Sequence, residues 1–491
     1  METHTPEIEP EASSHPFCRL YSEVKALCDE SLADNEAVGR FLSSRNELDR
    51  KIGSLASDDD SNLACLHAIE GLLYWLQPSH QEFDRVKNAQ AMLNHASTAI
   101  RLSENKPECI DTYAVGLYVK LRILSFLMKS KLLDEGELLE TREKAHSFVE
   151  SFEYGHSHMK RPDLLGLVLA ALGFSYYQVE GDRKIALHYL SKGNVQLEIA
   201  RSRNEESDPC KKMFLSGIAS VALWDTGLCY ESEAEQSNDS KEALSFFKKA
   251  RMSYTKALAA SKASPWLIYR ALVTYGIAGT LVREHELSDE LPNSERKLLI
   301  SKALSRGEEA SSCMRRWSLL ETDMLGGVAN ALFYQRMAEL SIGVEREECI
   351  ERSLDLISKA EAASRRVEGS RFSDANFGDI YLRGAHHYYK LAMERSSGGR
   401  GLLETSLKNC EASQKHFGDE RHLNRMVDSL ILGTRICTAL KELNTPDDIE
   451  SANRYLAEGK EQCQKSMSIC RRRGWDSRLR ETLELATVLE A

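Results

Sequence analysis

Histidines are the side chains in this sequence best suited to hold a metal ion, and they occur in two groups. His156 and His158 lie near His146, and His386 is followed directly by His387. Imidazole is a common ligand for zinc and other transition metals, but adjacent residues of a helix point about 100° apart. No cysteine or carboxylate completes a recognisable ligand spacing beside either group. We therefore expect neither a metal site nor a cofactor.

Arginines form the densest positive run, Arg471, Arg472 and Arg473, and Gly474 follows them. Such a run could bind a phosphate or an acidic partner. Cations also complement the carbonyl end of a helix, and glycine is the usual residue just after a helix terminus. We therefore expect these arginines to be the solvated last turn of a helix.

The spacing motifs of several enzyme classes are absent from the sequence. It contains no P-loop, no glycine-rich dinucleotide turn, no nucleophile elbow and no zincin helix. We therefore expect a protein that is not an enzyme. One enzyme class stays open, because α/α toroids such as glycosidases and cyclases also pair helices and place acid and base carboxylates at their mouths.

The composition indicates a large helical protein. Of its 491 residues, 42% are hydrophobic and 28% are charged, which is enough to enclose a substantial core. With only 10 prolines and 28 glycines, and with leucine in excess of valine plus isoleucine, the sequence favours helices over strands. The net charge of −11 argues against a nucleic-acid partner, which would require clustered Lys and Arg.

Segments that direct a chain to a membrane or out of the cell are not expected. Residues 1–16 are acidic and proline-containing and read as a disordered tail rather than a signal peptide. The longest apolar run, Leu164 to Phe174, is too short to span a bilayer. The 12 cysteines are scattered without a CxxC pair, which suits reduced thiols. We expect an intracellular, cytoplasmic protein, with the nucleus left open, and no membrane partner.

A residue triplet at spacing i, i+4, i+7 recurs along the chain, and this spacing places all three residues on one helix face. Its closing residue returns at a period of about 50 residues. The triplets are Ala89/Leu93/Ala96, Leu138/Arg142/Ala145, Ala186/Leu190/Gly193, Ala243/Phe247/Ala250, Ala303/Gly307/Ala310, Ser353/Ile357/Ala360, Leu403/Leu407/Cys410 and Ala452/Leu456/Gly459.

A second helix precedes most of these triplets and carries a small residue with a larger one three positions later. Small residues allow two helices to approach closely, and the larger side chain fills the groove beside them. Each repeat is therefore predicted to be a helical hairpin, and stacked hairpins share one continuous core. The pairs are Gly173/Tyr176, Gly227/Tyr230, Ala331/Tyr334, Ala385/Tyr388 and Gly433/Ile436.

These repeats resemble the tetratricopeptide-repeat superfamily. The most specific copies are Leu172, Gly173 and Tyr176 with Ala186, Leu190 and Gly193, and Trp224, Gly227 and Tyr230 with Ala243, Phe247 and Ala250. The family unit has about 34 residues, whereas the period here is about 50, and the proline that normally ends the second helix is missing. The resemblance covers roughly residues 63–489.

The resemblance implies an all-α, right-handed α-α superhelix, a tetratricopeptide-like solenoid of about eight to nine antiparallel helix pairs. Residues 17–474 would form this solenoid after the tail at 1–16. Residues 475–491 would form a C-terminal capping helix.

The resemblance also implies a concave groove lined by the first helix of each hairpin. In this family, ligand-facing positions follow the small residue of the motif by one, four and five residues. Carried over, the partner-binding candidates are Tyr177, Gln178, Glu231, Gln335, Arg336, His386, Tyr389 and Lys390. The expected function is a non-catalytic scaffold or adaptor that binds a peptide or a partner helix. The alternatives are an α/α-toroid enzyme and a regulator whose solenoid responds to a ligand.

Overall fold

The computed structural model describes most of the chain from residue 85 onward and a few residues before it. The described residues are 43, 46, 50, 63–68, 71, 85–129, 135–154, 161–203, 209–237, 239–262, 267–288, 291–315, 326–364, 374–394, 399–417, 423–443 and 448–490. The predicted tail at 1–16 and the histidines at 156 and 158 lie outside them.

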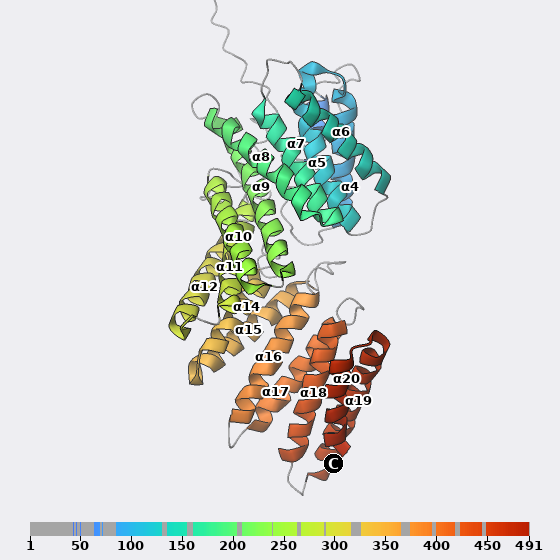
Figure 1. Cartoon of the computed structure of the whole chain (residues 1–491), viewed down its shortest axis with the longest axis vertical. Coiled ribbons are helices and arrows are strands. Elements are labelled where there is room, and N and C mark those ends of the chain that lie inside the picture. The colour runs from blue at the N-terminus through green and yellow to red at the C-terminus, as the bar shows by residue number, and fades with distance from the viewer. Residues whose placement is uncertain are drawn as a thin grey trace, which may run out of the picture. The chain divides into compact units, whose positions relative to one another are not determined.

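All regular structure in the described residues is helical, which confirms the predicted all-α class (Figure 1). The first half contains α4 (Arg85–Ser103), α5 (Ile110–Lys129), α6 (Glu135–Tyr154), α7 (Pro162–Ser175), α8 (Arg183–Arg203), α9 (Pro209–Gln236), α10 (Ser240–Ser261) and α11 (Leu267–Leu287). The second half contains α12 (Asn293–Arg315), α14 (Gly327–Leu340), α15 (Gly343–Ser364), α16 (Asp374–Glu394), α17 (Gly399–His416), α18 (Leu423–Leu443), α19 (Ile449–Arg473) and α20 (Asp476–Glu490).

Helix ends follow local signals in the sequence. The backbone N–H of Lys241 donates to the Asp239 side chain at 2.9 Å, which caps α10. Gly474 ends α19 in the left-handed region at φ 69°, and the next N–H donates to the Cys470 carbonyl at 3.0 Å. Arg471–Arg473 therefore form the last turn of α19, as predicted.

The eight predicted triplets fall one on each of eight alternating helices, namely α4, α6, α8, α10, α12, α15, α17 and α19. In the first seven of these, all three triplet residues are buried. In α19, Ala452 and Leu456 are only partly buried, and the core side chains are Tyr455 and Cys463 instead. The predicted register of that last helix was therefore wrong, because the larger Tyr455 takes the buried face.

Polar contacts between neighbouring repeats join residues about one period apart. Arg161 reaches Asp111 at 2.6 Å and Arg183 reaches Glu233 at 2.6 Å, and each pair is 50 residues apart. Arg400 reaches Asp448 at 3.3 Å, 48 residues away. Arg161 with Asp111, and Arg400 with Asp448, join the starts of equivalent helices in successive hairpins, which supports the repeat read from the sequence. The Arg183–Glu233 contact instead joins the start of α8 to the last turns of α9.

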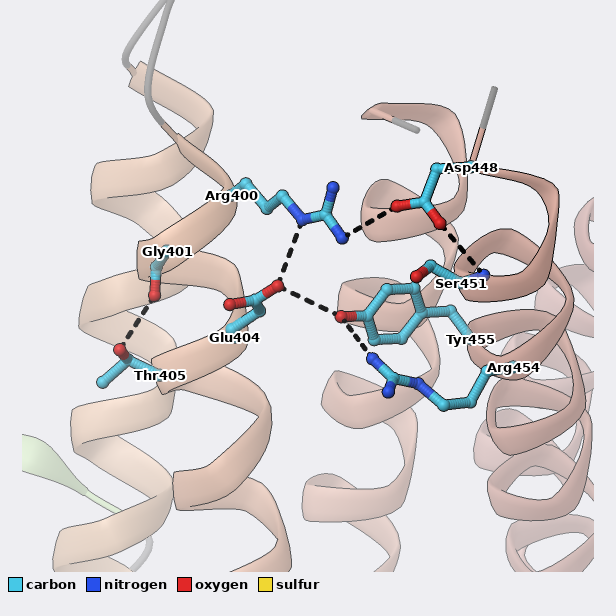
Figure 2. A network of polar contacts seen from close by, with 8 residues as sticks. All are labelled: Arg400, Gly401, Glu404, Thr405, Asp448, Ser451, Arg454 and Tyr455. Atoms are coloured by element: carbon cyan, nitrogen blue, oxygen red, sulfur yellow. Dashed lines mark hydrogen bonds and ion pairs between the residues drawn. The ribbon is translucent and has the colours of Figure 1, made fainter. Parts of the chain in front are cut away.

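Figure 2 shows one such link between α17 and α19. The guanidinium of Arg400 donates to Glu404 at 3.1 Å and to Asp448, while the Tyr455 hydroxyl donates to Glu404 at 3.2 Å. Asp448 also accepts from the backbone N–H of Ser451 at 3.4 Å, so the residue that caps α19 also holds the neighbouring repeat.

The chain divides into two units. Unit 1 comprises Met1–Glu290 with Ser305–Leu319, and unit 2 comprises Leu291–Leu304 with Leu320–Ala491. Within unit 1, each helix from α4 to α11 packs on the next, and α5, α7, α9 and α11 also pack on one another in order. We call these four the first helices of unit 1. The helices α14 to α20 of unit 2 pack in the same sequential way.

Glycines permit the close helix contacts expected from the sequence. The ring of Tyr254 on α10 is fully buried between Gly227 of α9 and Gly276 of α11. A Cβ on Gly227 would overlap that ring, and one on Gly276 would lie 2.9 Å from it. The small residue of this first helix is therefore required by the aromatic side chain of the second.

One stretch of the described residues is long and apolar enough to cross a membrane, Lys211–Gln236 in α9. It differs from Leu164–Phe174, the longest apolar run of the sequence. Of its most apolar window, 72% is buried inside the protein, and the core helix of a soluble protein has the same properties.

Candidate functional site

The predicted ligand-facing residues of the first hairpin motif lie on an irregular turn. After α7 the chain continues as a π-helical turn, η3 (Tyr176–Glu180), which ends at Gly181 with φ 66°. A π-turn inserts an extra residue and is frequent at functional sites. Here it directs two adjacent tyrosines to different helices. Tyr176 stacks on Tyr189 of α8 at 5.6 Å between ring centroids, and Tyr177 reaches α9.

Tyr177 and Glu231 are the two predicted site residues that the structure brings together. The Tyr177 hydroxyl donates to the Leu228 carbonyl at 3.4 Å, one turn before Glu231. Burial raises the pKa of Tyr177, and the nearby Cys229 and Glu231 raise it further. The tyrosine therefore stays protonated and can donate a hydrogen bond. Gln178, also predicted, lies partly buried on the same turn.

Glu231 has the most unusual acid–base property of this region. Burial raises the pKa of its carboxyl to about 7, a rise that a hydrogen bond with Tyr254 opposes, that Glu235 increases and that Arg283 reduces. Near neutral pH the group therefore exists in both its neutral and its charged form. It can both donate and accept a hydrogen bond there.

An open pocket of about 350 Å³ lies beside Glu235, one helical turn after Glu231. Phe247 and Ala243 give it an apolar wall, and Arg283 lies at its rim. The Arg283 guanidinium is 2.7 Å from Glu286 and 3.6 Å from Glu235. We call Tyr177, Glu231, Glu235, Arg283 and Glu286 the carboxylate strip; its three carboxyls outnumber its single cation.

A buried ion pair on the first helices was not foreseen. Arg122 of α5 is 2.7 Å from Asp225 of α9, and both side chains are nearly inaccessible at 7% and 0% exposure. The guanidinium also lies 3.8 Å from the ring centroid of Phe174 on α7. The contact ties three first helices together. Its sequence signal is weak: Asp225 is the one charge between Met213 and Tyr230 of α9, but α5 carries other charges besides Arg122.

Two of the predicted residues in unit 2 do not face solvent, and that part of the prediction was wrong. Gln335 is 0% exposed, and its side-chain amide donates to the Ser353 hydroxyl at 3.0 Å, joining α14 to α15. Arg336 is 9% exposed and pairs with Glu339 at 2.7 Å. The resemblance placed both in a groove, but Gln335 bonds to the neighbouring helix α15 and Arg336 pairs with Glu339 of its own helix.

The remaining predicted residues lie on α16 of unit 2. His386 and Lys390 are exposed, and Tyr389 is partly buried. Desolvation by the surrounding helices lowers the pKa of His386 although part of the ring reaches solvent, and the cations Lys390, Arg435 and Arg383 lower it further. This face of α16 is therefore positively charged, whereas the strip of unit 1 is acidic.

The histidines have packing roles where the structure describes them. His146 lies 3.0 Å from the Tyr176 hydroxyl and 3.4 Å from that of Tyr189. His387 is 5% exposed, and burial with the nearby cation Arg346 lowers its pKa to about 3. The described residues contain no group of three or more ligands that could hold a metal ion.

Comparisons with known proteins assign no family. No family model matches the chain, and no curated protein matches it either. Among solved structures, it is similar to a circular tandem repeat protein with novel repeat topology and enhanced subunit contact surfaces. The match has 13% sequence identity and a TM-score of 0.24, and it covers 96% of this chain and 98% of the other. It carries no conclusion about ligand or activity.

Proposed function

We propose that this protein is a non-catalytic interaction scaffold built as a right-handed tetratricopeptide-like superhelix of about eight to nine hairpins. Its unit 1 binds an extended peptide of a partner protein along the carboxylate strip. The observation that carries the proposal is the contact of Tyr177 with α9 one turn before Glu231, the equivalent position of the next hairpin, with an open pocket beside Glu235 one turn further on.

The chemistry of the strip defines the peptide. Tyr177 supplies ring area and a hydroxyl, and the carboxyls of Glu231, Glu235 and Glu286 accept hydrogen bonds from amide or cationic groups. Phe247 and Ala243 supply an apolar wall for one side chain. A peptide that carries Lys or Arg beside an apolar residue matches this arrangement.

A selection of random peptides on the intact chain tests the proposal. A phage-displayed library is panned on the wild type, and the recovered peptides are titrated against Glu231→Lys, with Lys460→Glu as the matched control. Lys460 is an exposed residue of α19 in unit 2, so reversing its charge leaves the carboxylate strip unchanged.

We expect recovered peptides rich in Lys or Arg whose affinity falls at least about tenfold in Glu231→Lys and stays within about twofold in the control. Their affinity also falls as the pH drops below 7, because Glu231 loses its charge. Peptides that bind both variants alike, or no recovered peptide at all, would overturn the proposal.

A further inference from the structure

A second surface of unit 1 lies between two helices that the predicted groove does not use. An open cavity of about 520 Å³ separates α8 from α10. Ala219 and Leu223 of α9 form its floor, and Val195 of α8 faces Ala259 of α10 across it. Small residues on a floor and wall let another backbone approach closely.

Large exposed apolar side chains lie on the two helices that border this cavity. Val195 is 57% exposed and Ile199 is 36% exposed, both on α8, while Met252 on α10 is 62% exposed. Scattered apolar residues on a surface need no explanation, but a cluster beside a groove is typical of an interaction site. Methionine in particular adapts to different partners.

Helix α10 carries five cations and one carboxylate, Glu242, although the chain has a net charge of −11. Its exposed lysines have no carboxylate within 4 Å among the described residues, in contrast to Arg251 of the same helix, which pairs with Glu284. These lysines are Lys241, Lys248, Lys249 and Lys256, and Lys262 follows directly after the helix.

The lysines and the apolar residues share one face of α10. Lys249, Met252, Lys256 and Ala259 follow one another at spacings of three, four and three, which keeps them on one side of a helix. Lys256 and Ala259 line the cavity itself. One wall of the groove therefore alternates positive charge with apolar contact over about 15 Å.

We propose that the groove between α8 and α10 binds an acidic amphipathic helix of a protein partner. The apolar face of that helix contacts Val195, Met252 and the alanines, and its carboxylates pair with the lysines of α10. A nucleic acid fits less well, because phosphate recognition does not use the exposed Val195 and Met252. The site uses different residues from the carboxylate strip, so each can fail without the other.

The test uses fluorescence anisotropy on the full chain with a designed, labelled peptide as the probe. The peptide is a helix with leucines at i, i+3, i+4 and i+7 and glutamates elsewhere, and a scrambled peptide of the same composition is the comparison. The protein variants are Lys249→Glu with Lys256→Glu, and separately Met252→Ser. Lys408→Glu with Lys460→Glu reverses two exposed lysines of α17 and α19 as the charge-matched control.

We expect the α10 double reversal to weaken binding at least about tenfold and Met252→Ser about threefold, while the control stays within about twofold. The scrambled peptide binds at least about tenfold more weakly. Hydrogen exchange of the wild type supplies a readout without mutation, because the bound peptide protects α8 and α10.

Three results would each overturn the inference. The scrambled peptide could bind as tightly as the helix, which would make the surface a non-specific cation patch. Duplex DNA could bind more tightly than the peptide and ignore Met252→Ser, which would indicate a nucleic-acid site. The peptide could also leave the exchange of α8 and α10 unchanged.

Discussion

The Arg122–Asp225 pair places two full charges inside unit 1. As long as both are present, their mutual attraction offsets the free energy of removing them from water. We expect Asp225→Ala to lower the free energy of unfolding by about 3–5 kcal/mol, because Arg122 would remain buried without its carboxylate. Urea unfolding followed by tryptophan fluorescence measures this loss.

A half-exposed ion pair is the control for that prediction. Asp428 and Arg478 lie 3.0 Å apart with each side chain 32% exposed, so Asp428→Ala should cost at most about 1 kcal/mol. Combining Asp225→Ala with Arg122→Met should recover most of the lost stability. Equal losses at the two aspartates would contradict the role assigned to burial.

Glu231 should make the stability of the protein fall as the pH rises. Its pKa in the folded state, about 7, exceeds the ordinary glutamate value of 4.5, so between these values the folded state binds more protons and loses stability with increasing pH. Glu231→Gln removes this cost. We expect the variant to be more stable than wild type by about 1–2 kcal/mol near pH 8.5.

The same comparison near pH 4 should show little difference from ionisation, because the carboxyl is then largely protonated in both states. Urea denaturation of both proteins across this pH range is the measurement. A stability gap that does not change with pH would show that Glu231 has the same pKa in the folded and unfolded states, as an exposed glutamate has.

At the level of the helices, the fit of Tyr254 between Gly227 and Gly276 gives a sharp packing test. Gly227→Ala should destabilise the protein by about 3 kcal/mol, because the added methyl overlaps a fully buried ring. Gly279→Ala on α11 is the matched control: its Cβ would meet no atom within 4 Å, and alanine is the better helix former by about 0.8 kcal/mol. Thermal unfolding by circular dichroism should separate the two in opposite directions.

The helices could be predicted because their signals are local. The i, i+4, i+7 triplets report which face of each helix is buried, and they identified the second helix of every described hairpin. In α19 the same rule chose Ala452 over Tyr455, since the pattern does not say which of two adjacent faces holds the larger side chain.

The site was less predictable, because it depends on which residues meet across the fold. Gln335 has the sequence position of a groove residue, yet its side-chain amide donates a hydrogen bond to Ser353 on the next helix. Arg122 and Asp225 are 103 residues apart, so the local sequence around either residue does not predict that the two form a pair. Tyr177 and Glu231 were named because the family resemblance assigns them to the same position of successive hairpins.

At the scale of the whole chain, the division into two units predicts separate local unfolding. In stacked repeats each hairpin contacts its neighbours, so a lesion weakens its own stretch most. We expect Asp225→Ala to speed amide hydrogen exchange in α5, α7 and α9 while exchange in α16 and α18 of unit 2 stays as in wild type. Native-state exchange read by mass spectrometry measures this. A uniform loss of protection over both units would contradict it.

The contacts that link residues 48 or 50 positions apart have a consequence for how such a chain can change in evolution. The Arg161–Asp111 and Arg400–Asp448 links join like positions, so a gene duplication that copies one period would supply both halves of a new junction at once. The array could lengthen or shorten by whole periods without inventing an interface. A change of any other length would break the register of every link that it crosses.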